Sequence, residues 1–407
     1  MSMSMSMRKA FLIVAFAVLC VGVISFVSYK QKGDVCYKVY NEEIITIPLA
    51  KFVSPSSHLQ YCIIDGKEML AANLENSELA FYDIAGKKQV HVINLLKDRG
   101  LCAFEYVNKD SIFLLYTLPY SYYRSGISDS VILADTLSFQ LIDYDGNVKK
   151  CYHFNCDDSN IDGVNLTVKD VLPPYSGLFY HKIMRSGNMV FFYPCRYLYN
   201  DVENMRNSKP FIACYDLNTE KYYFTKQKFP YLNDTAYCPI LEGSSNFLYF
   251  CISPDGLPVL RFSYSSDVFE WDYKNDVLIP HTLKSRIIDT TFLRNASDWP
   301  YYEGAYYSDI TYDPNMELYY TSIMFKVKNV HTTSTIIADR NFNYICEISG
   351  FFDCNTQFFH DTIINAGVSL FGDSNICISK CKLSVCDSCD SYVDSMRNLV
   401  DKAMLND

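Results

Sequence analysis

Four cysteines near the C-terminus are the residues whose types and spacing most resemble a chemical site. Cys386 and Cys389 form a C-x-x-C pair, and Cys377 and Cys381 precede them. Four thiolates can hold zinc or an iron–sulfur cluster, and a C-x-x-C pair can also form a disulfide. Structural zinc sites more often have a second C-x-x-C or a pair of histidines, and only one such pair is found here. A metal site, a disulfide between Cys386 and Cys389, and inert thiols therefore stay open as interpretations.

A second candidate is the string DSNIDG at residues 158–163. Asp158, Asn160 and Asp162 alternate and are followed by a glycine, as in the first half of a calcium-binding loop. The twelfth position of such a loop is a bidentate glutamate, but here it is Lys169. Aspartate and asparagine are also good turn formers. Calcium is therefore the one cofactor that the sequence suggests, and a plain turn is the competing interpretation.

Two tyrosine-rich segments between strands are the best signal for ligand binding. Residues 116–126 and 299–314 combine tyrosine with proline and glycine. Tyrosine offers a stacking face and a hydroxyl, which suits both sugars and protein surfaces. The competing interpretation is that these rings pack between sheets. The residues predicted to bind a ligand are Tyr120, Tyr122, Tyr123, Tyr301, Tyr302 and Tyr306.

No catalytic motif is found in the chain. It contains neither a G-x-S-x-G nucleophile elbow nor an H-E-x-x-H helix, and its seven histidines are scattered. A set of catalytic carboxylates contributed by different parts of the chain would not be visible as a motif. The sequence therefore predicts no catalytic residues, although it does not exclude an enzyme.

The charge of the chain argues against nucleic acid as a partner. The net charge is −10, and lysine and arginine occur in no run longer than short pairs such as Lys87-Lys88. Phosphate neutralisation requires clustered cations. We therefore do not expect the protein to bind nucleic acid.

The N-terminal 29 residues are expected to act as a signal peptide or membrane anchor. Arg8 and Lys9 precede an uncharged, apolar run from Ala10 to Val27. That run is longer than a usual signal-peptide core and reaches the lower end of a membrane span. An uncleaved anchor, cleavage near the end of the run, and lipidation at Cys20 stay open. All three place the body of the protein outside the cytoplasm, in the periplasm or on the outer surface of the cell envelope.

Recurring hairpins indicate the architecture that must position any site. Aromatics are abundant, with 34 Tyr and 27 Phe against 2 Trp, which favours strands. Five segments share an apolar strand that ends near an aspartate, then a polar turn and a second strand. In one of them, Asp145-Gly146 suits a two-residue turn. The five aspartates are Asp83, Asp143, Asp216, Asp272 and Asp339, separated by 56 to 73 residues.

Repeats of this size, each with a further preceding strand, are typical of propeller blades. A sixth blade is expected from the two ends, with an early strand at 42–50 and late strands at 367–379. Such pairing would close the ring. The prediction is an all-β propeller over residues 30–388, with six blades favoured over seven, followed by a helical tail over 389–407. The tail places Tyr392, Met396, Leu399, Val400 and Met404 on one face. A two-sheet sandwich is the alternative.

Several of these segments also resemble a known family. DSIFLLY, LIDYDGN, FIACYDLNTEKYY, ITYDPNMELYYTSI and IIADRNFNYICEI are similar to segments of a family of uncharacterised, propeller-like envelope lipoproteins of the Bacteroidota. The likeness extends from about residue 59 to residue 380. It implies a TolB-like, six-bladed propeller exported to the envelope, and it implies no activity. The chain departs from the family at Leu19, where a lipobox has a small residue.

Together these features favour a non-catalytic, envelope-tethered propeller that binds a protein or glycan partner through loops at one rim. The alternative is a propeller enzyme acting on glycans, a hydrolase or lyase, with carboxylates from different blades at the axis. A redox or metal role of residues 381–389 is a third hypothesis.

Overall fold

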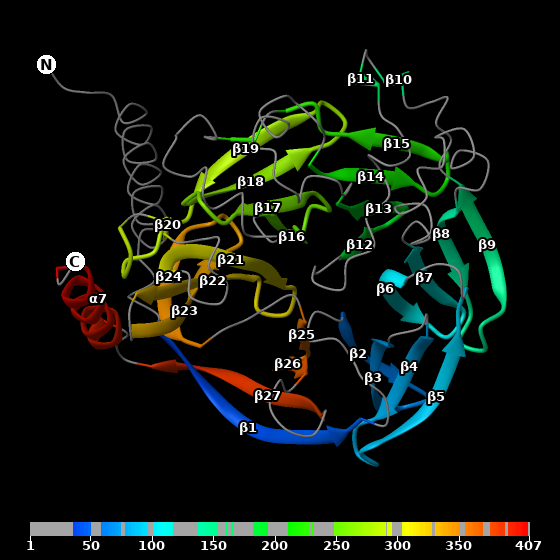
Figure 1. Cartoon of the computed structure of the whole chain (residues 1–407), viewed down its shortest axis with the longest axis horizontal. Helices are drawn as coiled ribbons and strands as arrows, with labels where there is room; N and C mark the ends of the chain where they lie inside the picture. The colour runs from blue at the N-terminus through cyan, green and yellow to red at the C-terminus, as the bar shows by residue number, and fades with distance from the viewer. Residues whose placement is uncertain are drawn as a thin grey trace, which may run out of the picture.

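Six antiparallel sheets arranged around a common centre form the body of the protein (Figure 1). The computed structural model describes residues 36–49, 58–74, 78–96, 101–116, 137–153, 160–161, 164–165, 182–193, 211–227, 229–230, 248–289, 291–294, 303–327, 330–350, 355–368, 375–386 and 390–405. The hairpin repeats predicted this arrangement, and the six-bladed β-propeller is confirmed.

Each blade takes its strands from one stretch of the chain, except the sixth. Blade 1 contains β2 (Leu59–Ile64), β3 (Lys67–Leu74), β4 (Glu78–Asp83) and β5 (Lys88–Asn94). Blade 2 contains β6 (Leu101–Asn108), β7 (Ser111–Tyr116), β8 (Leu137–Ile142) and β9 (Val148–His153). Blade 3 contains β12 (Ile183–Ser186), β13 (Met189–Phe192), β14 (Ala213–Asp216) and β15 (Lys221–Phe224). A separate two-stranded hairpin, β10 (Asn160–Ile161) and β11 (Val164–Asn165), lies between blades 2 and 3 in the chain.

The second half of the ring follows the same plan. Blade 4 contains β16 (Leu248–Ile252), β17 (Pro258–Phe262), β18 (Asp267–Asp272) and β19 (Val277–Thr282). Blade 5 has five strands, β20 (Phe292–Arg294), β21 (Glu303–Asp313), β22 (Leu318–Val327), β23 (Val330–Asp339) and β24 (Tyr344–Ser349). Blade 6 contains β25 (Thr356–Phe359), β26 (Thr362–Val368), β27 (Asn375–Cys386) and β1 (Cys36–Pro48). We call β2, β6, β12, β16, β21 and β25 the central strands, because they surround the middle of the ring (Figure 1).

The recurring aspartates fix the outer hairpin of each blade. Asp143 accepts a hydrogen bond from the backbone N–H of Asn147 at 2.8 Å, and Asp216 accepts one from Asn218 at 2.9 Å. The backbone N–H of Asn218 is the main cause that holds the pKa of Asp216 below its ordinary value. These are Asx-type turns, in which the side chain satisfies the turn backbone. The same arrangement is found at Asp83, Asp272 and Asp339.

The turn at Asp145-Gly146 is longer than predicted. Five residues, 143–147, separate the ends of β8 and β9, rather than two. Asp143 forms backbone hydrogen bonds with both Gly146 and Asn147, and these bonds add residues to the turn. Gly146 has a φ of +86°, a conformation that glycine adopts without strain.

Apolar side chains fill the spaces between neighbouring blades. Six buried clusters occur, one for each of the six interfaces around the ring. The cluster between blades 2 and 3, for example, includes Phe113, Phe139, Val190 and Tyr215. Because each sheet is covered on both faces by its neighbours, most strands carry nearly continuous apolar runs instead of strict alternation.

The ring is closed by the two ends of the chain, as predicted. β1 pairs antiparallel with β27 from Cys36 opposite Cys386 to Pro48 opposite Asn375. Within blade 6 the strand order is β1-β27-β26-β25, so β1 is the outermost strand and not an early one. The C-terminal strands already occupy the inner positions, which leaves the outer edge for the N-terminal strand.

The C-terminal helix α7 (Asp390–Leu405) packs against blade 5. Tyr392, Met396 and Val400 contact the cluster between blades 4 and 5, as the helical pattern predicted. Leu399 is 41% exposed, so its predicted place on the packed face was wrong. The packed stripe turns instead toward Val393. Within the described residues, no helix is both long and apolar enough to cross a bilayer.

Candidate functional site

Most residues that the sequence predicted for a site lie outside the described part of the chain. These are Cys20, Tyr120, Tyr122, Tyr123, Asp158, Asp162, Tyr301, Tyr302 and Cys389. For Asn160 only the backbone is described, in β10, where it pairs with Asn165. The lipid, calcium and aromatic-loop hypotheses therefore stay predictions.

Two predicted residues fall within the described structure. Tyr306 lies on the central strand β21 and is half-buried. Cys386 is the last residue of β27 and packs against the cluster between blades 5 and 6. Among the described residues, no three histidine, cysteine, aspartate or glutamate side chains are grouped so that they could hold a metal ion.

Amide side chains join the central strands to one another. The Gln60 side chain of β2 donates to the carbonyl of Tyr106 in β6 at 2.9 Å and accepts from the N–H of Tyr106 at 2.7 Å. On the other side of blade 1, the N–H of Leu59 donates to Asn355 at 2.9 Å, and Gln357 donates to the carbonyl of Leu59 at 3.0 Å. These bonds hold blades 6, 1 and 2 in register around the centre, so that charged groups on the central strands have fixed positions.

Glu105 is the most perturbed of these charged groups. It lies on β6 opposite Phe113, and the Arg185 guanidinium of β12 stacks over the Phe113 ring at 4.7 Å. Burial raises the pKa of Glu105 to about 7, although the Arg185 charge and the Arg185 backbone N–H oppose the rise. The Oε2 atom of Glu105 and the Nε atom of Arg185 are both buried and have no hydrogen-bond partner in the part of the chain that the structure describes.

His58 and Lys182 lie immediately before the central strands β2 and β12. Burial, with the Lys182 charge as a second cause, lowers the pKa of His58 to about 3. The imidazole is therefore neutral at physiological pH, and it lies edge-on to Phe104 with the ring centres 5.0 Å apart. Since β2 and β12 belong to blades 1 and 3, this electrostatic coupling crosses blade 2.

Asp309 is a strained residue on the central strand of blade 5. It is 5% exposed, has a φ of +38°, and forms a β-bulge where the register shifts between Ser308 and Ile310. A positive φ at a non-glycine residue is uncommon and is often found at functional sites. Both Asp309 and Lys182 influence the buried thiol of Cys251, whose pKa burial raises to about 12.

We call His58, Glu105, Lys182, Arg185 and Asp309 the axial group. They lie on or immediately before the central strands of blades 1, 2, 3 and 5, and they offer cations, a neutral imidazole and carboxyl groups. A carboxyl group with a pKa of about 7 can accept or donate a proton at neutral pH. The arrangement suits recognition of a polar ligand, and acid–base chemistry is within its reach.

Sequence reasoning missed the axial group. Its members come from four blades and form no motif, and only Lys182 and Arg185 are close together in the sequence. One signal was available, because Glu105 is a lone charge in the otherwise apolar strand LCAFEYVN. A buried charge is costly unless it is paired or functional, so such a residue marks a position worth testing.

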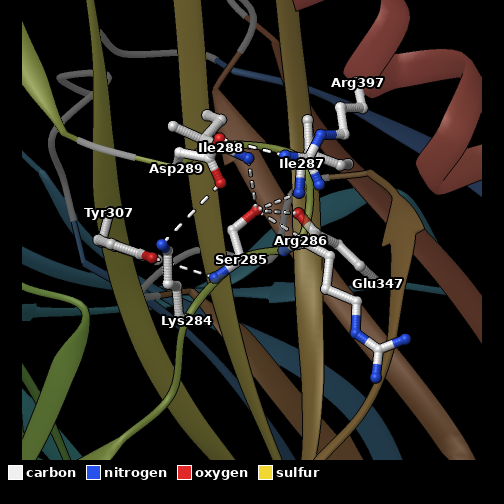
Figure 2. A network of polar contacts seen from close by, with 9 residues as sticks. All are labelled: Lys284, Ser285, Arg286, Ile287, Ile288, Asp289, Tyr307, Glu347 and Arg397. Carbon is white, nitrogen blue, oxygen red and sulfur yellow. Dashed lines mark hydrogen bonds and ion pairs between the residues drawn. The ribbon is translucent and has the colours of Figure 1, made fainter.

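A second polar cluster lies between blades 4 and 5 and below α7 (Figure 2). Glu347 is fully buried and accepts hydrogen bonds from Ser285 Oγ at 2.8 Å, Ser334 Oγ at 2.6 Å and the backbone N–H of Arg286 at 3.0 Å. Burial raises the pKa of Glu347, and these donors oppose the rise. The N–H of Ser285 in turn donates to the hydroxyl of Tyr307 at 3.1 Å.

This cluster fastens the loop 284–289 to blade 5 and to the helix. Arg397 of α7 forms an ion pair with Asp289 at 3.1 Å, and Lys284 lies 3.9 Å from the same carboxylate (Figure 2). Both Glu347 oxygens already have donors, which leaves them little capacity for a ligand. An open pocket next to the loop is lined by Lys284, Ser285, Arg286, Asp289, Val393, Asp394 and Arg397. We interpret this cluster as structural, because it holds the loop 284–289 against blade 5 and α7. The axial group is the better candidate for a functional site.

The fold and the central strands define the class of protein as a six-bladed β-propeller. Among solved structures, the chain is similar to the crystal structure of a member of the duf4221 family from Bacteroides vulgatus. The TM-score is 0.59 at 14% sequence identity, and the match covers 87% of this chain and 100% of that chain. No family model matches the sequence, and no curated protein matches it. The predicted likeness to an uncharacterised propeller family of the Bacteroidota is thus confirmed in the fold, which is what a match at this identity shows.

Proposed function

We propose that the protein is a non-catalytic binding propeller of the cell envelope, tethered to a membrane through its N-terminus, whose partner is a glycan or a protein. The axial group, with the tyrosine-rich loops at one rim, is the proposed binding site. The observation that carries the proposal is the buried Glu105 Oε2 atom, which lies near the Arg185 charge and has no hydrogen-bond partner among the described residues. A buried polar atom of this kind costs free energy unless a ligand or solvent satisfies it.

The chemistry of the two side chains supports a ligand rich in hydroxyl or amide groups. A hydroxyl group can donate to the Glu105 carboxylate and accept from the Arg185 guanidinium at the same time. The backbone amide of a peptide offers the same pair of functions. Tyr306, on the central strand β21, adds an aromatic ring of the kind that packs against sugar faces.

Thermal unfolding of the full chain in detergent, with a panel of envelope and dietary glycans and of extended peptides, tests the proposal. A ligand present at 100 times its dissociation constant adds about 2.7 kcal/mol of stability, which raises the melting temperature measurably. We expect one class of ligand to raise it, and Glu105→Gln and Arg185→Met to abolish the rise. The control is Glu220→Gln, since Glu220 is an exposed residue in the turn before β15 and pairs with Lys150 of the outer strand β9. An equal rise in all three variants would place the binding site elsewhere and contradict the proposal.

The second candidate is a glycan-active enzyme, and the pKa of Glu105 favours it. A glutamate with a pKa of about 7 suits a general acid that protonates a leaving group near neutral pH. On this hypothesis the purified protein cleaves one of the glycans that stabilise it. Glu105→Gln would then abolish turnover without lowering the melting temperature. Stabilisation without any turnover supports the binding protein instead.

A further inference from the structure

We propose that Cys36 and Cys386 form a disulfide that locks the closure of the propeller ring. Cys36 is the first residue of β1, and Cys386 is the last residue of β27. The two lie directly opposite each other in the antiparallel register of these strands. In the described strands, this is the one register position at which two cysteines face each other across a strand pair.

Both side chains lie on the same side of the sheet. Cys36 is buried in the cluster between blades 5 and 6, and Cys386 packs against that same cluster. Residues directly opposite in an antiparallel pair have Cβ atoms about 4.5–5.5 Å apart. A disulfide requires about 3.5–4.5 Å. The structure holds both residues as thiols, and a small adjustment at these strand ends brings the sulfur atoms together.

The bond forms by thiol–disulfide exchange. A thiolate of one cysteine attacks a disulfide of the oxidant, and the second cysteine then displaces the oxidant's sulfur. The two cysteines lose two protons and two electrons, and the oxidant's disulfide is reduced to two thiols. The oxidant is a protein or small-molecule disulfide of an oxidising compartment, where the apolar N-terminal segment is expected to send the chain. This pairing differs from the C-x-x-C disulfide that the sequence suggested, in which Cys386 bonds to Cys389.

The position of the link makes it consequential. The β1–β27 pair brings the two ends of the chain into one sheet and so completes the sixth blade of the ring. A bond from Cys36 to Cys386 encloses almost the whole described chain, so it restricts the unfolded state strongly and prevents β1 from leaving blade 6. Reduction would then permit opening of the ring at this edge.

The test uses the full chain equilibrated with oxidised and reduced glutathione and then quenched with acid. Free thiols are alkylated under denaturing conditions, and a peptide map without reductant identifies linked peptides. We expect a linked pair that contains Cys36 and Cys386. We also expect reductant to lower the melting temperature of the natural chain by several degrees, but not that of Cys36→Ser.

Two matched variants make the outcome decisive. Cys377→Ser removes an exposed thiol of the same strand and should leave both the link and the effect of reductant unchanged. Cys389→Ser should also leave them unchanged, because the proposed link does not involve that residue. Alkylation of both Cys36 and Cys386, or a peptide that joins Cys386 to Cys389, would overturn the proposal.

Discussion

The pKa of Glu105 leads to a prediction about how stability depends on pH. Burial raises this pKa from an ordinary 4.5 to about 7 in the folded protein. A carboxyl group whose pKa is raised by folding contributes stability that is fully present below its unfolded pKa. That stability is lost as the pH rises through the folded pKa. The natural protein therefore loses stability between about pH 5 and pH 8 through this one residue.

The size of the effect follows from the two pKa values. The difference between 4.5 and about 7 is about 2.5, and each pKa unit corresponds to about 1.4 kcal/mol, so the full loss is about 3 kcal/mol. Glu105→Gln does not titrate and escapes the loss. We expect the stability of the glutamine variant relative to the natural protein to rise by about 2.5 kcal/mol from pH 5 to pH 8. Other titrating groups are common to both proteins and cancel in the comparison.

Urea unfolding across this pH range provides the assay, with tryptophan fluorescence as the signal. Trp271 is fully buried and donates to Asp276 at 3.0 Å, so its emission should report loss of blade 4 packing. Glu317→Gln is the control, since that side chain is 60% exposed and lies 3.5 Å from Arg340. If the Glu105→Gln difference stays flat with pH, as expected for the control, the carboxylate is solvated or paired. The physical argument for the axial site would then be wrong.

Substitutions at three further residues, Glu347, Gln60 and His58, test the other polar groups by urea unfolding. Glu347→Ala should lower the free energy of unfolding by about 3–5 kcal/mol, because it leaves several buried donors without an acceptor. Glu347→Gln should lower it by less than half as much. Similar losses in the two variants would contradict the proposed hydrogen bonds. Gln60→Leu should lower the free energy of unfolding by about 2 kcal/mol and speed hydrogen exchange of the Tyr106 amide. Unchanged exchange would show that the two hydrogen bonds between Gln60 and Tyr106 are not formed in solution. The pKa of His58 is lowered from 6.5 to about 3, so this residue contributes stability above pH 6.5 that is lost on acidification. The free energy of unfolding of His58→Phe should therefore rise by about 2 kcal/mol relative to the natural protein when the pH is lowered to 5. The absence of such a rise would place the imidazole in solvent.

The fold could be predicted from the sequence because its determinants are local. Each recurring aspartate closes a turn with the backbone of its own hairpin, as at Asp143 and Asp216, so the repeat is visible within a dozen residues. Ring closure was also accessible, since an incomplete set of strands at each end implies that the ends pair. Local patterns did not decide which side of α7 is covered. Leu399 fits the helical stripe, but the stripe of α7 that packs against the blades turns toward Val393.

The axial group could not be predicted in the same way. Glu105 and Arg185 are 80 residues apart and meet only because blades 2 and 3 are neighbours in the ring. The strongest sequence candidates followed short motifs, and most of those residues lie outside the described chain. Cys386 shows the limit of such motifs within it, because the C-x-x-C spacing points to Cys389 while the strand register places Cys36 opposite.

The two buried glutamates show why the axial group, and not the cluster below α7, is the better candidate for function. Glu347 is fully buried, yet hydroxyl and backbone donors satisfy both of its oxygens. Glu105 is held by fewer donors, and none of the described residues donates to its Oε2 atom. The unpartnered Nε atom of Arg185 is weaker support for a ligand site. Arg261 also has an unpartnered Nε atom, although its other guanidinium nitrogens donate to backbone carbonyl groups. The fold can saturate a buried carboxylate, as it does at Glu347. A carboxylate left unsaturated on a central strand is therefore more simply explained by a partner from outside the chain than by imperfect packing.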